Sequence, residues 1–161
     1  MITVLVASYN GSRYIKQQLD SILAQDEKDI HILVSDDCSA DGSGELLKEY
    51  EERHRDRILV LFRRKPSGGA AAHFLKLLKL MADADHNPDA DHNPDADHSP
   101  DADHDTEALP GPLSLLSEYE VTENQLERLG PLARADYFML SDQDDVWLPQ
   151  KARMLSDKMK E

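Results

Sequence analysis

The 161-residue sequence is poor in cysteine, in long apolar runs and in clustered basic residues, and each shortage excludes a class of protein. Cys38 is the single cysteine, so an internal disulfide is impossible and a reducing compartment is expected. No apolar run approaches the roughly 20 residues of a membrane-spanning helix, and the N-terminal segment lacks the basic stretch of a signal peptide. No basic face is available for nucleic acid phosphates. These absences favour a cytoplasmic protein, with peripheral docking on the inner face of the membrane left open.

The acidic excess is concentrated in one segment. Residues 83–107 hold ten Asp or Glu and no Lys or Arg, which is −10 of the net charge of −14 and leaves −4 for the remainder. A hexapeptide repeats there, as DADHNP at 83–88 and 89–94, DADHSP at 95–100, and DADHD at 101–105. Proline in each complete unit opposes a helix, and no apolar side chain larger than Ala is present to bury. We expect a disordered loop, in which recurring His and Asp could also bind metal weakly.

Outside the repeat, β-branched apolar runs alternate with segments of helical periodicity. The expected strands are 2–7, 30–35, 57–62 and 137–140. The helices between and after them should turn their apolar faces inward: Ile15, Leu19, Ile22 and Leu23 in the first; Phe74, Leu77, Leu78 and Met81 in the third; Ala152, Leu155 and Met159 in the last, which Pro149 opens. The second helix is expected at about 43–54. This alternation predicts an α/β fold, a mainly parallel sheet with helices on both faces.

The predicted domain is therefore discontinuous. Residues 1–82 and 134–161 form the α/β unit, and the repeat interrupts it. The rest of the insertion, 108–133, has helical periodicity over 113–129, with Ser114 or Thr122 as the N-cap.

Polar clusters follow three of the expected strands, at Ser8–Ser12, Asp36–Asp41 and Asp142–Asp145. In parallel α/β sheets, ligands bind beyond the carboxyl ends of the strands, so these clusters should meet at one site. In an extended chain residues i and i+2 point to the same side, which lets Asp142 and Asp144 converge. Two carboxylates suit Mg²⁺ or Mn²⁺ together with a diphosphate leaving group. The alternative is a solvated acidic turn that caps the last helix.

The loop after the second strand also resembles the start of a calcium-binding loop, but its twelfth position is Lys48 instead of Glu, which excludes that site. What remains is an acid that accepts from a nucleobase N–H or a ribose hydroxyl, or a capping network of Ser39, Asp41 and Ser43. The Gly68-Gly69 loop, preceded by three basic residues at 63–65, reads as a turn more readily than as a phosphate loop. Trp147 is interpreted as a packing anchor.

Four segments together resemble the family 2 glycosyltransferases of GT-A type, in particular the bacterial branch that includes rhamnosyltransferases. They are Ala7-Ser8-Tyr9-Asn10-Gly11, Gln17 to Gln25 (QQLDSILAQ), Ser35-Asp36-Asp37-Cys38-Ser39, and Ser141 to Trp147 (SDQDDVW). The resemblance implies a Rossmann-like fold that binds a UDP- or dTDP-linked sugar. It implies transfer with inversion to a hydroxyl of a glycan or lipid-linked glycan, with rhamnose as one candidate sugar, in cell-surface polysaccharide synthesis.

The same resemblance assigns roles to residues. Ala7 and Tyr9 would line the nucleotide pocket, and Asp36, with Asp37 beside it, would contact the uracil or thymine ring. Asp142 and Asp144 would be the DXD pair, with Asp142 also near the nucleotide, Asp144 most directly on the metal and Asp145 adjacent. The family's general base lies well beyond the DXD segment, so we expect it beyond the C-terminus of this chain and assign no catalytic residue.

Two other functions are compatible with parts of the sequence. A nucleotidyltransferase could share the sheet and an acidic metal site, but it normally has a Gly- and Lys/Arg-rich loop after the first strand, where this chain has Tyr9-Asn10-Gly11-Ser12. A non-enzymatic metal-binding protein could act through the Asp/His repeat alone. Deleting 83–105 separates these readings, because a donor-binding domain should keep its nucleotide affinity.

Overall fold

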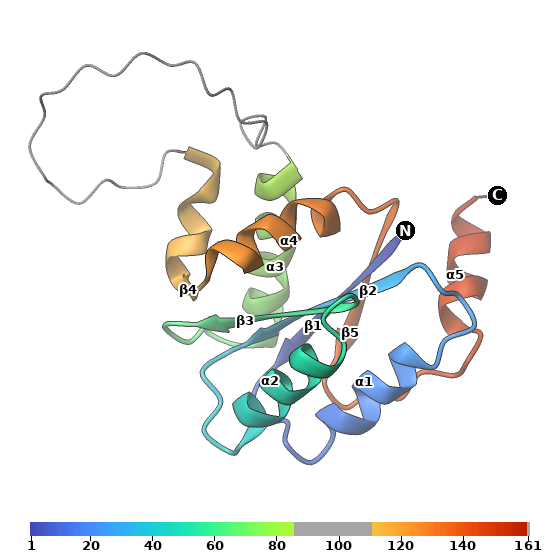
Figure 1. The fold of residues 1–161 in the computed structure, drawn as a ribbon, viewed down its shortest axis with the longest axis horizontal. Coiled ribbons are helices and arrows are strands. Elements are labelled where there is room, and N and C mark those ends of the chain that lie inside the picture. The colour runs from blue at the N-terminus through green and yellow to red at the C-terminus, as the bar shows by residue number, and fades with distance from the viewer. Residues whose placement is uncertain (86–110, 161) are drawn as a thin grey trace, which may run out of the picture.

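The computed structural model describes residues 1–85 and 111–160, which fold around a five-stranded sheet of order β4-β3-β2-β1-β5 (Figure 1). The strands are β1 (Ile2–Ser8), β2 (Ile30–Asp36), β3 (Ile58–Arg63), β4 (Tyr119–Glu120) and β5 (Tyr137–Asp142). Neighbouring strands are parallel except for β4, which pairs antiparallel with β3. The prediction of a mainly parallel α/β sheet is confirmed.

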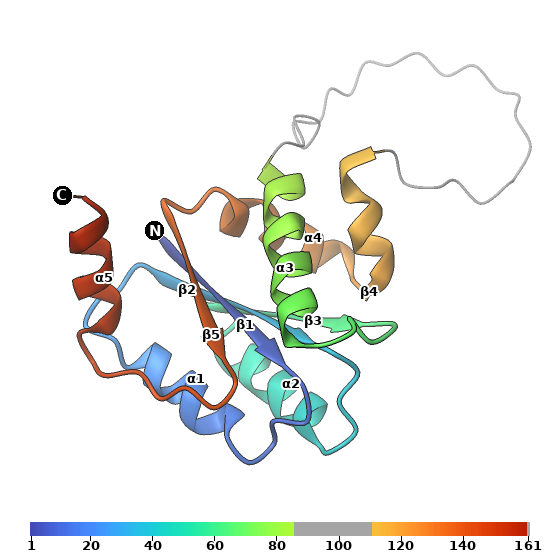
Figure 2. The same ribbon diagram turned by 180° about the vertical axis from the view of Figure 1, so that it is seen from behind.

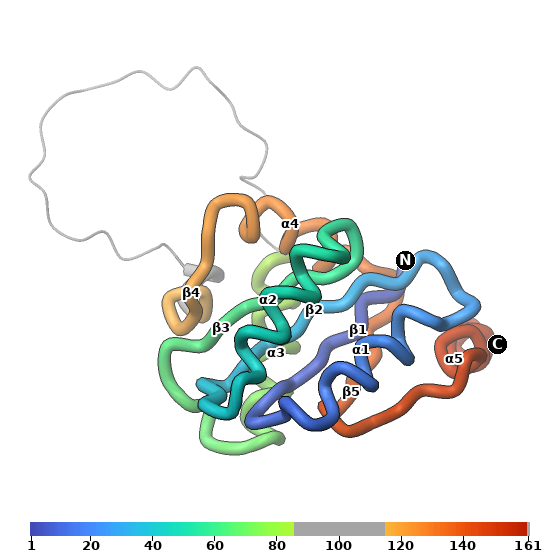
Figure 3. Tube along the Cα trace, turned by 60° about the horizontal axis from the view of Figure 1, so that its bottom comes forward, coloured from blue at the N-terminus to red at the C-terminus, as the bar shows by residue number. Residues whose placement is uncertain are grey.

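Helices cover both faces of this sheet. The elements are α1 (Ile15–Leu23), α2 (Ser43–Arg53), α3 (Ala70–Asp85), the 3₁₀ helix η2 (Gly111–Glu118), α4 (Glu123–Ala133) and α5 (Lys151–Met159). Helices α1 and α2 lie side by side on one face (Figure 3), while α3 and α4 lie on the other (Figure 2). None of the described helices is both long and apolar enough to cross a membrane.

Each face of the sheet has its own core, because successive side chains of a strand point to opposite sides. Val4 and Val6 of β1 pack toward α1 and α2, whereas Leu5 and Ala7 pack toward α3 and α4. Strands buried on both faces read as continuous apolar runs, which is why the first two strands were recognisable from composition alone.

The helix faces were predicted with mixed success. The face of α1 is confirmed, since Ile15, Leu19 and Ile22 are buried and Leu23 is partly buried. In α3 the packed stripe is Leu77, Leu80, Met81 and Ala84, so the prediction for Leu78, which is 37% exposed, is wrong.

The predicted inward face of α5 is confirmed for Ala152 and wrong for the other two residues. Leu155 and Met159 are exposed, and Ala152 and Ser156 are the buried residues of this helix. The helix begins at Lys151, two residues after Pro149. It packs against the domain through the two small residues Ala152 and Ser156. Apolar spacing therefore identified the helix but not its packed side.

The predicted boundary at the repeat lies inside α3. This helix continues through Asp83 and Ala84 to Asp85, and Ala84 is buried against the sheet. The first proline of the repeat is Pro88, so nothing in the first three repeat residues opposes the helix. The remainder of the predicted disordered loop lies outside the described residues.

A single helix over 113–129 was predicted, and the structure contradicts it. The chain forms η2, adds β4 to the edge of the sheet, and only then enters α4 at Glu123. The alternative cap, Thr122, is confirmed: its Oγ1 accepts from Gln125 N–H at 3.3 Å, and Gln125 Oε1 accepts from Thr122 N–H at 3.0 Å. Leu116, Tyr119 and Leu129 of this region are buried in the same core as α3.

This capping box supports a stability prediction. Thr122→Ala should lower the free energy of unfolding by about 1 kcal/mol, because it removes the side-chain acceptor that the capping box provides for the Gln125 N–H. Thr122→Ser keeps the hydroxyl and should retain most of the stability. Urea unfolding of both variants measures the difference, and equal stabilities would show that the hydroxyl contributes nothing.

Candidate functional site

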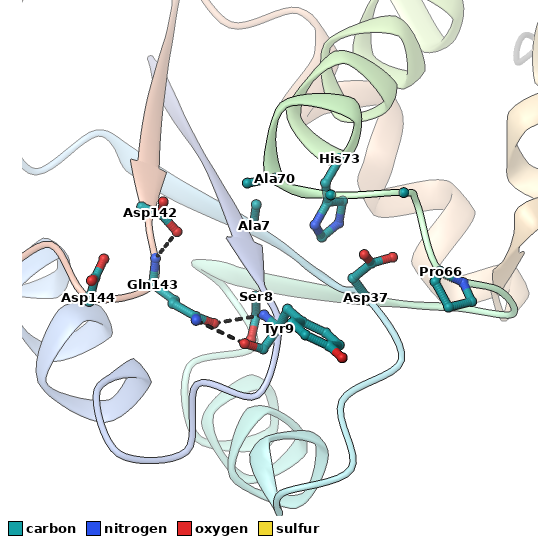
Figure 4. A pocket seen from close by; sticks show the side chains of 12 residues that line it. Ala7, Ser8, Tyr9, Asp37, Pro66, Ala70, His73, Asp142, Gln143 and Asp144 are labelled. Carbon is teal, nitrogen blue, oxygen red and sulfur yellow. Dashed lines mark hydrogen bonds between the residues drawn. The ribbon is translucent and has the colours of Figure 1, made fainter.

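The strand order places a switch point between β1 and β5. The chain moves from β1 to β2 and β3 on one side, then returns to place β5 on the other side of β1. Such a reversal leaves a crevice beyond the carboxyl ends of the strands. A cleft of about 460 Å³ is found there (Figure 4). It is lined by Ala7, Ser8, Tyr9, Asp37, Pro66, Gly68, Gly69, Ala70, His73, Asp142, Gln143 and Asp144.

Most of the predicted site residues line this cleft. Ala7 and Tyr9 come from the end of β1, Asp37 follows β2, and Asp142 and Asp144 follow β5 on the opposite wall (Figure 4). The structure therefore brings together three strand ends that the sequence predicted to converge.

Asp36 and Asp145 do not line the cleft. Asp36 is 3% exposed, its Oδ2 accepts from Ser39 N–H at 2.9 Å, and its Oδ1 accepts from Ser39 Oγ at 2.6 Å. Of the two neighbouring carboxylates after β2, Asp37 lines the cleft and Asp36 bonds to Ser39, so the predicted contact of Asp36 with a nucleobase stays a prediction. Asp145 is exposed outside the cleft, and its N–H donates to the Asp142 carbonyl at 3.2 Å.

The acidic wall fits a hard divalent cation. Within residues 1–85 and 111–160 no three His, Cys, Asp or Glu side chains are grouped to hold a metal ion. Asp142 and Asp144 supply two carboxylates to one wall, and Mg²⁺ or Mn²⁺ commonly takes only one or two protein carboxylates beside water and phosphate oxygens. Asp142 and Asp144 could hold such an ion in the cleft, whereas Asp145, the third predicted ligand, is not among the lining residues.

The loops after β1 and β2 are cross-linked by side chains. Ser39 Oγ accepts from Asn10 N–H at 2.8 Å, Ser43 Oγ from Gly11 N–H at 2.9 Å, and Asp41 Oδ2 from Ser12 N–H at 2.9 Å. Burial opposes ionisation of Asp41, but hydrogen bonds from Ser43 and Ser12 outweigh it and lower its pKa. Ser39, Asp41 and Ser43 therefore form a polar network between the two loops. The predicted helix cap is not formed, because the N-cap of α2 is Gly42, which has no side-chain capping hydrogen bond.

Gln143 was not predicted as a site residue, but it joins the two walls of the cleft by hydrogen bonds. Its Oε1 accepts from Tyr9 N–H at 2.7 Å and its Nε2 donates to the Tyr9 carbonyl at 2.9 Å (Figure 4). A Cβ at Gly11 would overlap the Gln143 amide, so a larger residue there would require this side chain to shift. The middle residue of the Asp-Gln-Asp segment therefore sets the separation of β1 and β5 loops.

Helix α1 anchors the chain that follows β5. Gln18 is buried and its Nε2 donates to Ser141 Oγ at 2.8 Å and to the Asp142 carbonyl. Gln25 Nε2 donates to the Leu148 carbonyl at 2.7 Å, and its Oε1 accepts from Ala152 N–H at 3.0 Å. These bonds explain why two glutamines at this spacing accompany the acidic segment.

The burial of Trp147 confirms the packing role that was predicted for it, and its backbone also bonds to α1. The indole is buried in the core with α1, and the Trp147 N–H donates to Ser21 Oγ at 2.9 Å. Lys151 Nζ lies 4.2 Å from the centroid of the ring. The backbone on either side of Asp144 is therefore held by α1, through the bond from Gln18 to the Asp142 carbonyl and the bond from Trp147 N–H to Ser21.

A buried charge network lies behind Asp37. The Arg63 side chain is 0% exposed; its Nε lies 3.1 Å from Asp37 Oδ1 and its Nη2 lies 2.6 Å from Glu118 Oε2. The hydrogen bond from Arg63 is the main cause that lowers the pKa of Glu118 to about 2. Arg63 therefore serves an internal ion network, and a role for it in a phosphate loop is excluded by its burial.

The Gly68-Gly69 turn forms the remaining wall. Both glycines have left-handed φ angles, +100° and +123°, which favour glycine at these positions. Ser67 N–H and Ser67 Oγ each donate to the Asp37 carboxylate at 2.7 Å. The segment is a turn, as predicted, and it also lines the cleft.

His73 also lines the cleft and was not predicted as a site residue. It is buried, and its Nε2 lies 2.7 Å from Ser35 Oγ, which in turn is 3.4 Å from the Tyr119 hydroxyl. Desolvation lowers the pKa of His73, so the ring is neutral near pH 7. The available signal was a histidine in the first turn after a Gly-Gly loop.

Comparisons with known proteins agree with this geometry. The "dTDP-rhamnosyl transferase RfbG" of Shigella flexneri is 36% identical over 74 residues, which are 46% of this chain and 26% of that protein. The "Glycosyltransferase GlyA" of Streptococcus pneumoniae serotype 4 is 42% identical over 71 residues, covering 44% of this chain and 10% of that one. The chain thus spans about a quarter or less of the length of these relatives.

Among solved structures, S. aureus TarS 1-349 in complex with UDP-GlcNAc superposes with a TM-score of 0.54 at 17% identity, covering 99% of this chain and 31% of that one. This likeness concerns the fold, which is of GT-A type. The family model for glycosyl transferase family 2 matches residues 3–92, just over half of the chain. The chain therefore belongs to glycosyltransferase family 2.

Proposed function

We propose that the cleft binds a nucleoside diphosphate sugar and that the chain provides the donor site of a glycosyltransferase. The observation that carries this proposal is the switch-point cleft, which has a polar nucleoside wall around Tyr9 and Asp37 and an acidic wall of Asp142 and Asp144. Membership of glycosyltransferase family 2 supports it.

The lining residues divide the cleft into two halves with different chemistry. Tyr9 is 56% exposed at the rim, where its ring offers a stacking surface for a base, and Asp37 offers a hydrogen-bond acceptor. The backbone of Gly68-Gly69 can approach a ligand closely because no side chain intervenes. Asp142 and Asp144 would hold Mg²⁺ or Mn²⁺ with the diphosphate. A bound cation supplies positive charge against the charge that develops on the departing diphosphate.

The complete reaction is proposed from the family. The sugar passes from a UDP- or dTDP-linked donor to an acceptor hydroxyl on a glycan or lipid-linked glycan, with inversion at the anomeric carbon, in cell-surface polysaccharide synthesis. The name of RfbG makes dTDP-rhamnose the first sugar donor to test. No residue of the described cleft is assigned as the general base.

Titration calorimetry of the chain with UDP and dTDP, each with and without Mn²⁺, tests the donor site. We expect Mn²⁺-dependent binding, and Asp144→Ala should weaken it by about tenfold or more, because a tenfold loss corresponds to only about 1.4 kcal/mol of contact energy. Asp157→Ala, an exposed carboxylate on α5, is the matched control and should bind as the wild type does.

Two outcomes would change this proposal. If the wild-type chain binds neither nucleotide, the cleft is not a donor site in this chain. If Asp145→Ala weakens Mn²⁺-dependent binding as much as Asp144→Ala, the ion lies toward Asp145 and outside the cleft wall described above.

A further inference from the structure

The Asp37 carboxylate has its acceptor positions almost filled. A carboxylate offers about four lone-pair positions. Ser67 N–H and Arg63 Nε approach Oδ1 at 2.7 and 3.1 Å, and Ser67 Oγ donates to Oδ2 at 2.7 Å. The side chain is 8% exposed, yet it lines the cleft. One position, on Oδ2, is therefore left for a ligand.

A single fixed acceptor selects among nucleobases. Uracil and thymine carry an N–H donor at ring position 3, whereas cytosine has an unprotonated acceptor nitrogen there. The open acceptor position of Asp37 would bond the first two bases and would meet cytosine lone pair to lone pair, which is unfavourable for a buried polar group. Discrimination of this kind depends on the carboxylate staying in one orientation.

Arg63 holds the orientation of Asp37 from the side away from the cleft. The Arg63 guanidinium is buried, lies 5.0 Å from the centroid of the Tyr119 ring, and contacts Glu118 at 2.6 Å. Glu118 is itself held by Lys76 Nζ at 3.2 Å. Arg63 Nε also donates to the Lys65 carbonyl at 3.2 Å. The guanidinium is thus held on one side by this bond and its ion pair with Asp37, and on the other by the charge-assisted hydrogen bond from Nη2 to Glu118.

Glu118 belongs to η2, in the part of the chain that follows the acidic repeat. Its position next to Arg63 is secured by the edge of the sheet, because Arg64 N–H donates to the Glu118 carbonyl at 2.8 Å and Arg63 pairs with Tyr119 in the β3–β4 ladder. The segment that adds β4 to the sheet therefore also brings a carboxylate to the back of the nucleoside wall.

We propose that Glu118 is a positioning residue for base selectivity. It holds Arg63, Arg63 holds the orientation of Asp37 through their ion pair, and Asp37 prefers a base with a ring N–H over cytosine. This inference rests on the proposed donor site. It makes the region after the repeat part of nucleotide recognition although it does not line the cleft.

The experiment compares UDP with CDP in calorimetric titrations with Mn²⁺, for the wild type and Glu118→Gln. The glutamine keeps the size of the side chain and removes its charge. We expect the wild type to prefer UDP by about tenfold or more, the scale of one good hydrogen bond. In Glu118→Gln the UDP:CDP ratio should fall at least about threefold through loss of UDP affinity, with CDP affinity unchanged.

Glu120→Gln is the matched control, because this exposed glutamate of β4 loses the same charge two residues away. Glu118→Asp keeps the charge but withdraws it from Arg63, and its UDP:CDP ratio should lie between those of the wild type and Glu118→Gln. This second variant tests the inference even if the glutamine variant does not fold.

The outcomes separate the two proposals. A purely structural Glu118 would lower UDP and CDP affinity together and leave their ratio unchanged, which overturns the inference and leaves the donor site intact. Equal affinity of the wild type for UDP and CDP would also overturn it. Absence of binding of either nucleotide to the wild type would refute the donor site itself.

Discussion

Arg63→Met should lower the free energy of unfolding by about 3 kcal/mol, since removing one partner of a buried ion pair leaves uncompensated charge in the interior. Arg63 is the cation between Asp37 and Glu118, and its side chain has no exposure to water. Methionine keeps much of the volume, so the loss would report the charge more than a cavity. Urea unfolding at pH 7 measures the change.

The matched control for this substitution is Arg53→Met. Arg53 forms an ion pair with Glu49 four residues earlier on the surface of α2, where such pairs contribute about 0.5 kcal/mol or less. A similar loss of unfolding free energy in the two variants would mean that the Arg63 network stabilises the domain no more than a surface ion pair does.

The same network gives an acid dependence with a definite sign. The pKa of Glu118 is lowered from 4.5 to about 2, mainly by its hydrogen bond from Arg63. A depressed carboxyl pKa contributes stability that is fully present above pH 4.5 and is lost as the pH falls toward 2. Arg63→Met should weaken the pH dependence of unfolding in this interval. An unchanged slope between pH 4.5 and 2 in the variant would contradict the assignment.

Gln143→Glu should weaken UDP binding about tenfold, with or without Mn²⁺. Gln143 both accepts from Tyr9 N–H and donates to the Tyr9 carbonyl, and glutamate cannot make the second bond. An ionised glutamate would also face that carbonyl oxygen, so the β1 loop should move away from the acidic wall. Loss of a hydrogen bond with an unpaired partner costs about 1–3 kcal/mol, which corresponds to tenfold or more in affinity.

Gln17→Glu makes the same chemical change at an exposed position of α1 and is the matched control. A second variant, Gly11→Ala, should act in the same direction, because its methyl group overlaps the Gln143 amide. Wild-type UDP affinity in Gln143→Glu would show that the clamp does not set the width of the cleft.

Local sequence was sufficient for the position of the cleft and for the order of strands and helices, except for the η2, β4 and α4 region between α3 and β5. The apolar runs that became β1, β2 and β3 are buried along almost their whole length, and a strand of this kind is visible without knowing its neighbours. β5 lies at the edge of the sheet and is partly exposed, but its run of four apolar residues was still recognisable. Polar clusters at 8–12, 36–41 and 142–145 follow three of these strands, and parallel pairing is enough to bring them to one edge. The packing role of Trp147 was likewise readable from its place after the acidic segment.

Which neighbour in each cluster faces the cleft was decided by tertiary structure. Asp36 and Asp37 are chemically identical and adjacent. Both carboxylate oxygens of Asp36 accept hydrogen bonds from Ser39. The Asp37 carboxylate instead contacts Arg63 and Ser67 and lines the cleft. Tertiary structure also decided which side of α5 is packed. Its apolar residues at 155 and 159 are exposed, because the helix contacts the domain along another side.

The partners that hold the site lie far apart in the chain, and this is the physical reason why the sequence could not reveal them. Glu118 meets Arg63 across 55 residues and Gln143 meets Tyr9 across 134, contacts that exist only after β4 and β5 have joined opposite sides of the sheet. Periodicity and turn chemistry act over a few residues and determined the elements and their polar ends. Hydrogen bonds and ion pairs between those ends require the assembled sheet, and they decided which side chains form the cleft.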